Sequence, residues 1–301
     1  MKRIIAFALL ACMLVLALAA CGPANKEYKL AIGVAVTDTV ATLETEQTVA
    51  AVVLDKDNKI VACRIDTLAV KATVTDGAVD SAPTYKTKME LGDDYGMLSD
   101  YGSKLAEWDD QVKALESFVV GKTQAEVAAI TGEETDLVAG CTIGIDDFLK
   151  AIDNAFKDEY KVSFSTAGTV TLGVAMNGDV ADKSAKANFT TDTAAVAMVD
   201  GKVVAATIDS IDANITYDED GVGSEFAYKG SKREQGDDYG MLGDYGSKLA
   251  EWYDQAQAYA DSAVGKTASE LAGLATEGVT GCTIYAGGYK AAIEKAAGYA
   301  R

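Results

Sequence analysis

Histidine does not occur in this sequence of 301 residues, although it is the side chain best suited to moving protons near neutral pH. Its absence excludes catalysis by a histidine acid or base, and it excludes zinc sites that contain histidine. Basic residues are also scarce, with 27 Lys and Arg against 46 Asp and Glu and a net charge of −19. A surface of this charge repels phosphate backbones, so we expect no nucleic-acid partner.

Cysteine is too sparse to predict a disulfide framework, since the chain has only five. Cys12 lies in an N-terminal segment that we expect to be removed on export, and Cys21 lies at its cleavage point. The remaining three, Cys63, Cys141 and Cys282, cannot all pair within one chain. The sequence also lacks a serine-centred nucleophile motif, which disfavours a hydrolase.

One long apolar run is present, and it stands at the N-terminus. Lys2 and Arg3 precede apolar residues 4–20, which end in the sequence Leu-Ala-Ala before Cys21. A positive start, a short apolar segment and small residues at the cleavage point are typical of an export signal. Residues 18–21 resemble the bacterial lipobox, which implies that Cys21 becomes the lipid-modified first residue.

Two alternatives to this interpretation are a plain signal peptide and a membrane-spanning helix. The run is slightly short for a span, which needs about 20 residues. We therefore expect a signal peptide over residues 1–20 and a lipid-anchored linker over 21–27, with the protein exported and held on the outer face of the membrane.

Removal of the signal leaves 25 basic residues against 46 acidic ones, a net charge near −21. Anionic lipid repels such a chain, so attachment depends on the acyl groups.

The rest of the chain repeats itself at an offset of 144 residues. Residues 92–108 read GDDYGMLSDYGSKLAEW, and residues 236–252 differ from them only in having Gly243 in place of Ser99. Residues 58–66, 121–123 and 140–142 are also similar to residues 201–209, 265–267 and 281–283. This period is too long for a solenoid unit and indicates a duplicated domain. We therefore expect repeat 1 over residues 28–157 and repeat 2 over residues 158–301.

Within each repeat, strand-like segments come before helical ones. Residues 30–36 suit a strand, and residues 49–65 read as a β-hairpin that is repeated around Asp200-Gly201. Apolar residues then recur every three or four positions, which predicts one buried helix face: Leu105, Trp108, Val112, Leu115 and Val119, and in the second repeat Leu249, Trp252, Ala256, Tyr259 and Ala263. Capping-box spacing at Thr123 and Thr267 predicts a second helix, and a third is expected over residues 146–156 and 289–299. The predicted fold class is α+β, with two tandem copies of a small antiparallel sheet followed by packed helices.

The loop before each third helix shows a shared pattern of an acidic residue, three residues, glycine, cysteine and threonine. The residues are Asp136, Gly140, Cys141 and Thr142 in repeat 1, and Glu277, Gly281, Cys282 and Thr283 in repeat 2. A helix N-terminus attracts phosphate, and glycine allows the backbone to approach it closely. A threonine hydroxyl there can contact a phosphate ester or be joined to one. The structural alternative is a turn in which the threonine is the N-cap of the helix.

These residues resemble the flavinylation motif of FMN-binding domains, whose threonine carries FMN through a phosphoester bond. The strand and hairpin at residues 52–66 and 198–209 also look like the start of that domain. The resemblance implies covalent FMN on Thr142 and Thr283, with Asp136, Glu277, Gly140 and Gly281 as the other motif positions. This chain departs from the motif in having cysteine before each threonine, and Ala139 or Thr280 where serine is usual.

The GDDYGM segments lie outside this resemblance. Asp93, Asp94 and their equivalents Asp237 and Asp238 are candidates for lining a ligand pocket, although they lack the spacing of a calcium loop. Trp108 and Trp252 either stack on a flat ring or belong to the core, and their helical spacing favours the core. Cys141 and Cys282 either tune a flavin or are small buried residues, and the second interpretation is favoured.

The resemblance implies an extracytoplasmic electron carrier, not an enzyme with its own substrate. Its cofactor is FMN, one in each repeat, and its partners are the membrane, a flavin transferase and a membrane electron donor. The alternative function is a non-redox surface lipoprotein that binds a ligand or partner through the repeated GDDYGM segments.

Overall fold

The computed structural model describes residues 24–80, 85–131 and 138–301. The strands are β1 (Lys26–Thr39), β2 (Glu44–Leu54), β3 (Ile60–Lys71), β4 (Val74–Thr75), β5 (Ala78–Val79), β6 (Val162–Thr166), β7 (Thr171–Asp182), β8 (Lys186–Val199), β9 (Lys202–Tyr217) and β10 (Gly223–Tyr228). The α-helices are α2 (Lys88–Leu91), α3 (Trp108–Val119), α4 (Gln124–Ala128), α5 (Asp146–Lys157), α6 (Lys232–Gln235), α7 (Trp252–Asp261), α8 (Ala268–Leu271) and α9 (Gly287–Gly298). Short 3-10 turns are η1 (Val40–Thr42), η2 (Gly92–Tyr95) and η4 (Gly236–Tyr239).

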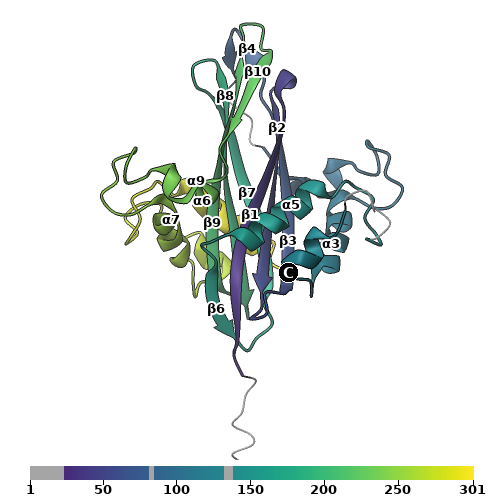
Figure 1. The fold of residues 1–301 in the computed structure, drawn as a ribbon, viewed down its shortest axis with the longest axis vertical. Helices are drawn as coiled ribbons and strands as arrows, with labels where there is room; N and C mark the ends of the chain where they lie inside the picture. Colours follow the sequence, from purple (N-terminus) through teal and green to yellow (C-terminus); the bar gives the residue numbers. More distant parts are fainter. Residues whose placement is uncertain (1–23, 81–84, 132–137) are drawn as a thin grey trace, which may run out of the picture.

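The long strands form two antiparallel sheets that run along the long axis of the molecule (Figure 1). One sheet has the strand order β3-β2-β1-β6, and the other has the order β10-β9-β8-β7. The β4-β5 pair makes a separate two-stranded sheet. The α+β fold class with antiparallel sheets and several helices is therefore confirmed.

Both faces of the long strands are apolar, and both are covered by other parts of the molecule. In β1, Leu30, Ile32 and Val34 belong to a core that also contains residues of β7, β8 and β9. The alternate residues Ala31 and Ala35 pack in a second core with α3 and α5. Sheets that are buried on both sides need nearly continuous apolar sequence, and that is what these strands have.

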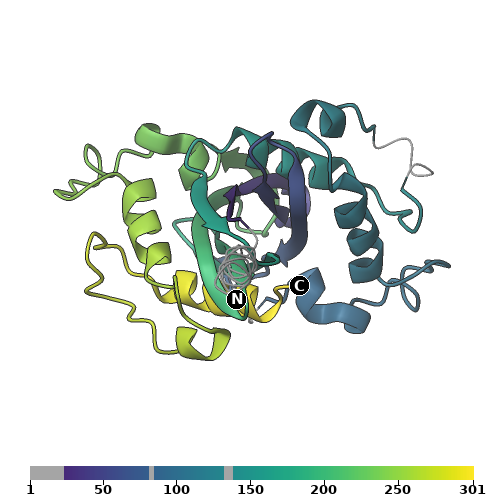
Figure 2. The same ribbon diagram turned by 90° about the horizontal axis from the view of Figure 1, so that it is seen from below.

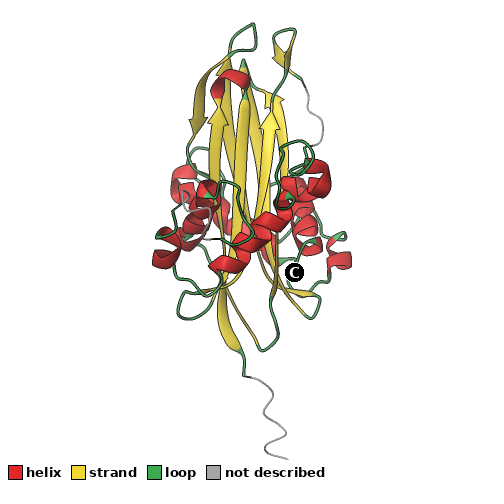
Figure 3. Ribbon diagram, turned by 90° about the vertical axis from the view of Figure 1, so that its right-hand side faces the viewer, coloured by secondary structure: helices red, strands yellow, loops and turns green. Residues whose placement is uncertain are grey.

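The layers follow the order helices, sheet, sheet, helices. Helices α3 and α5 cover the first sheet, and α7 and α9 cover the second. Figure 2 shows the strands curving around a common centre, with one group of helices on either side. Figure 3 shows that the strands extend beyond the level of the helices at one end.

The predicted hairpins are confirmed. Strands β2 and β3 pair from Glu44 opposite Lys71 to Leu54 opposite Ile60, with one register shift near the turn, and β8 pairs with β9 in the same way. Asn58 (φ 54°) and Asp200 (φ 51°) have the left-handed backbone that tight turns require, and both residue types tolerate it. The capping boxes at Thr123 and Thr267 are confirmed as well.

The prediction for the first residue of the long apolar helix face is wrong in both halves. Leu105 and Leu249 precede the helices, and their side chains are 48% and 50% exposed. In the first half, the Glu107 carboxylate accepts the N–H groups of Met97 and Leu98 and so closes the preceding residues into a loop. The helix therefore begins only at Trp108, from where the predicted face is buried.

Strand β6 joins the two halves of the chain. The sequence predicts a strand beginning near Tyr160 as the start of repeat 2, and β6 does lie there. Its partner, however, is β1 in the first half, with Tyr28 opposite Phe164 and the two rings stacked 5.5 Å apart. The two predicted repeats thus share a sheet as well as a core.

No helix within the described residues is long and apolar enough to cross a membrane. The predictions for the export signal and for Cys21 concern residues 1–23, which lie outside the described residues.

Two glycines set how closely the long helices approach the sheets. A Cβ atom on Gly33 of β1 would lie 2.1 Å from the Ala155 nitrogen, and one on Gly173 of β7 would lie 1.8 Å from the Ala296 oxygen. These contacts are with helix backbone, which cannot rotate away.

We predict that Gly33→Ala and Gly173→Ala each lower the free energy of unfolding by about 3 kcal/mol, measured by urea denaturation. Gly298→Ala is the control, because its Cβ meets nothing within 4 Å among the described residues, and it should leave stability unchanged or slightly raised.

Candidate functional site

The two candidate attachment threonines are exposed, and each is held by a buried glutamine. In the first half, the Thr142 backbone N–H and its Oγ1 hydroxyl both donate to Gln111 Oε1, at 2.9 and 3.0 Å. Gln111 belongs to α3 and is fully buried. Its Nε2 donates to Ser103 Oγ at 3.3 Å and to the Ala106 carbonyl at 2.9 Å.

The same arrangement recurs in the second half. Thr283 N–H and Oγ1 donate to Oε1 of the buried Gln255 at 2.9 and 2.7 Å. Gln255 Nε2 donates to Ser247 Oγ at 3.1 Å and to the Ala250 carbonyl at 2.8 Å. We call each arrangement a threonine clamp: Ser103, Gln111 and Thr142 in the first half, and Ser247, Gln255 and Thr283 in the second.

The helix bounds exclude a role of either threonine as the N-cap. The N-cap residues of α5 and α9 are Ile145 and Ala286, three residues after the threonines, so the N-cap prediction is wrong. The reason is that Gln111 and Gln255 engage both the N–H and the hydroxyl of each threonine. Because the glutamine oxygen accepts the hydroxyl proton, the lone pairs of each threonine Oγ1 are not used in this hydrogen bond.

The neighbouring motif residues follow the sequence prediction in part. Gly140 and Gly281 have φ of 93° and 82°, a region that residues with a Cβ rarely adopt, so glycine is required at both. Glu277 is exposed in the same loop as Gly281. Asp136 lies outside the described residues.

The two loop cysteines are core residues. Cys141 and Cys282 are 2% and 7% exposed, and burial raises the pKa of both thiols. A raised pKa disfavours the thiolate, so neither thiol is activated as a nucleophile. The third cysteine, Cys63, is buried in the core of the first half, and all three are free thiols.

The tryptophans belong to the core, as their spacing predicts, but each supports a lysine that the sequence reasoning missed. Lys88 Nζ lies 5.2 Å from the Tyr95 ring centre and 5.9 Å from that of Trp108. Its partner carboxylate is Glu46 of β2, at 2.9 Å. Cation–π contact and ion pairing together hold this ammonium group against the loop.

The second half keeps this arrangement with a different carboxylate. Lys232 lies 5.2 Å from Tyr239 and 5.6 Å from Trp252, and its ion-pair partner is Asp212 of β9, at 3.5 Å. The capping boxes at Thr87 and Ser231 start the short helices that carry the two lysines. A search of the sequence for S/T-x-x-E ahead of GDDYGM would have found both helices.

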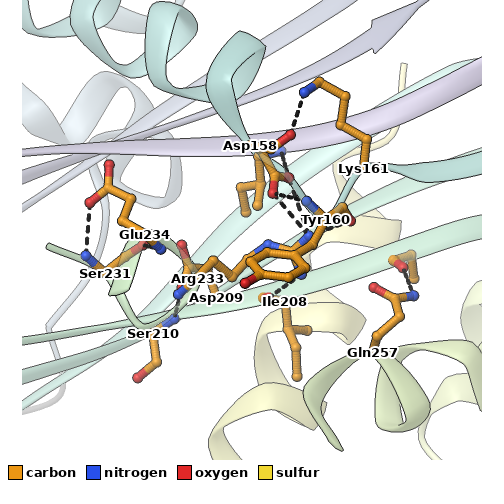
Figure 4. A network of polar contacts seen from close by, with 12 residues as sticks. Asp158, Tyr160, Lys161, Ile208, Asp209, Ser210, Ser231, Arg233, Glu234 and Gln257 are labelled. Atoms are coloured by element: carbon orange, nitrogen blue, oxygen red, sulfur yellow. Dashed lines mark hydrogen bonds and ion pairs between the residues drawn. The ribbon is translucent and has the colours of Figure 1, made fainter. Parts of the chain in front are cut away.

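A separate cavity of about 570 Å³ lies where the two halves meet. Its wall includes the buried ion pair between Asp158, at the end of α5, and Arg233 of α6, with Arg233 Nη2 3.2 Å from both carboxylate oxygens (Figure 4). Tyr160 lies over the guanidinium and stacks on Tyr253 with 4.0 Å between ring centres. Asp237 and Asp238 of the GDDYGM segment line the same cavity. Within the described ranges, no group of three or more Asp, Glu, Cys or His side chains could hold a metal ion.

Each half also buries an aspartate beneath its short helix. Asp66 accepts the N–H groups of Thr67 and Met89, and Asp209 accepts those of Ser210 and Arg233. Desolvation raises the pKa of both carboxyls to about 7. Asp66 Oδ2 has no hydrogen-bond partner among the described residues, which suits a protonated carboxyl.

These carboxyls predict a specific pH dependence of stability. The folded protein binds more protons than the unfolded chain between pH about 4 and 7, so its free energy of unfolding falls as the pH rises through that window. Asp66→Asn keeps the acceptor oxygen and removes the ionisation. We expect this variant to be more stable than the parent at pH 8 by about 1–3 kcal/mol, with a smaller difference at pH 4.5. Urea denaturation at both pH values checks this, with the exposed Asp94→Asn as control, and an equal effect at both values would contradict it.

Comparison of the chain with protein-family models, with curated proteins and with solved structures found no match. The two halves of the chain hold the hydroxyls of two exposed threonines in the same way.

Proposed function

We propose that this protein is an extracytoplasmic, lipid-anchored electron carrier with FMN esterified to Thr142 and Thr283. The observation that carries the proposal is the paired threonine clamp, in which a buried glutamine holds the hydroxyl of an exposed threonine in each half. The motif resemblance at residues 136–142 and 277–283 supports the identity of the cofactor.

The proposal includes a duplication, with residues 28–157 and 158–301 as two copies of one domain. The support is that matching elements follow in the same order in both halves: a three-stranded meander, a capped short helix, GDDYGM, a clamp helix and a last helix. With one FMN on each clamp threonine, a single lipid-anchored chain would hold two cofactors of the same kind.

The attachment residues fit a phosphoester. The side-chain amide of the clamp glutamine accepts the hydroxyl proton of the threonine. The glycine two positions before the threonine has no Cβ, so the backbone there can approach a ligand closely. FMN, once bound, would supply the redox chemistry. The protein contributes attachment, orientation and a strongly acidic surface.

Ester formation balances if the flavin phosphate arrives in a pyrophosphate linkage, as in a flavin dinucleotide. The threonine oxygen forms a bond to phosphorus, and the phosphorus–oxygen bond to the leaving nucleoside monophosphate breaks. The hydroxyl proton passes to a base of the transferase. Gln111 and Gln255 orient the hydroxyl for this step and do not ionise.

The two sites differ in how well they suit a phosphate. Helix α9, which follows Thr283, begins with Gly287 and Gly288, whereas α5, which follows Thr142, begins with Asp146 and Asp147. The positive end of a helix dipole favours phosphate, and two carboxylates in the first turn oppose it. We therefore expect Thr283 to be modified more readily than Thr142.

The remaining parts of the proposal concern location and partners. Lipidation of Cys21 would anchor the chain to the outer face of the cell membrane, and electrons would come from a membrane donor. A flavin transferase would act on the exported protein. The lipobox resemblance at residues 18–21 supports this arrangement.

Intact-mass and peptide analysis of protein exported beside a flavin transferase tests the proposal. We predict two added FMN groups on the parent, one on each single variant Thr142→Ala and Thr283→Ala, and none on the double variant. At limiting transferase, Thr283 should fill before Thr142. The variants Thr142→Ser and Thr283→Ser are the controls, since they keep a hydroxyl. A colourless parent without added mass contradicts the proposal and favours the alternative of a non-redox binding lipoprotein.

A further inference from the structure

Residues 92–107 and 236–251, which we call the twin loops, are nearly identical although the elements that follow them have diverged. The loops differ only at Ser99 and Gly243. The next helices, α3 and α7, keep the tryptophan and the clamp glutamine but replace most other positions. A requirement that both halves share must therefore restrict the sequence of the loops more strongly than the sequence of the helices that follow them.

Part of the loop sequence is explained by the fold. Gly96 and Gly240 have φ of 76° and 73°, so a glycine is needed at each. Glu107 and Glu251 accept two backbone N–H groups each, from residues 97 and 98 and from residues 241 and 242. Ser103 and Ser247 belong to the clamps.

Three large side chains in each loop remain largely exposed, although the ring of Tyr101 stacks on Tyr95 and that of Tyr245 stacks on Tyr239. Leu98, Tyr101 and Leu105 are 47%, 67% and 48% exposed, and Leu242, Tyr245 and Leu249 are 46%, 66% and 50% exposed. Because these side chains are largely exposed, packing in the core does not explain why the same residues occur in both halves with nearly the same exposed fractions. Groups of exposed leucine and tyrosine are typical of surfaces that are covered by a partner.

The loops are connected to the candidate attachment sites. Ser103 Oγ accepts the Leu105 N–H and the Gln111 amide, and Gln111 in turn holds Thr142. Ser247, Leu249, Gln255 and Thr283 repeat this chain of contacts. Figures 1 and 2 show the two loops projecting from opposite flanks of the molecule, so one partner cannot cover both at once.

We propose that the twin loops are the docking surface for the enzyme that esterifies Thr142 and Thr283. This inference rests on the proposed function and adds the place of recognition. An enzyme that modifies two sites needs the same surface beside each, and it must hold each hydroxyl in a fixed position relative to its own active site. The loop leucines and tyrosine are the apolar anchors of that contact.

The charge of the loops defines the partner further. Each loop carries three exposed aspartates and one exposed lysine: Asp93, Asp94, Asp100 and Lys104, and in the second loop Asp237, Asp238, Asp244 and Lys248. The partner surface is therefore an apolar pocket with a basic rim, and added salt slows its association.

The two halves allow a test with a control inside the same molecule. The variant carries Leu98→Ala, Tyr101→Ala and Leu105→Ala, and it is exported beside a limiting amount of the flavin transferase. Peptide mass analysis should show at least a tenfold slower modification of Thr142 and an unchanged rate at Thr283. The matching variant of Leu242, Tyr245 and Leu249 should slow only Thr283.

The outcomes separate the two proposals. If Thr142 and Thr283 are both modified at the parent rate in both loop variants, the docking inference is wrong while the proposed function stands. If one loop variant slows both sites equally, the effect is not local and the inference is also overturned. If the parent carries no flavin, the proposed function is wrong and the inference falls with it. Should a triple variant fail to fold by circular dichroism, Tyr101→Ala and Tyr245→Ala alone provide the same comparison.

Discussion

The structure depends on the apolar contact between the two sheets. Strands β1, β2 and β3 contribute one wall of a shared core, and β7, β8 and β9 contribute the other. Neither sheet could leave this face in water, because its residues are Leu, Ile, Val, Met, Phe and Ala with almost no exposed area. Strand β6 adds backbone hydrogen bonds between the two halves of the chain, because it follows α5 and pairs with β1. The two sequence repeats therefore depend on each other for burial.

This central contact places the helices, and with them the clamps, on the outside. Each sheet has only its outer face free for helices, so α3 and α5 cover one sheet and α7 and α9 cover the other. The clamp glutamines lie on α3 and α7, which Figure 1 shows on opposite flanks of the sheets, and Thr142 and Thr283 are hydrogen-bonded to them. A molecule of this form presents two separate sites, each with its own projecting loop.

Charged groups tie the halves together around the core. Arg233 of the second half pairs with Asp158, the C-cap residue of the first-half helix α5, and Arg64 of the first half donates to the Tyr299 carbonyl at the end of α9. In both cases an arginine reaches the C-terminal end of a helix from the opposite half, where the helix dipole favours a positive charge. Arg64 is also paired with Glu116, and both side chains are almost fully buried. Removing one partner of either ion pair would leave an unpaired buried charge.

The sequence by itself determined the features that depend on near neighbours: the hairpins, the capping boxes at Thr123 and Thr267, and the burial of the tryptophans and cysteines. It also singled out Thr142 and Thr283. Only the tertiary structure decided what holds them, because Gln111 and Thr142 are 31 residues apart and meet through helix packing. The same applies to the pairing of β6 with β1 and to the contact of Arg233 with Asp158, 75 residues away. Local patterns report which face of an element is apolar, whereas the choice of partner for that face depends on the packing of the whole chain.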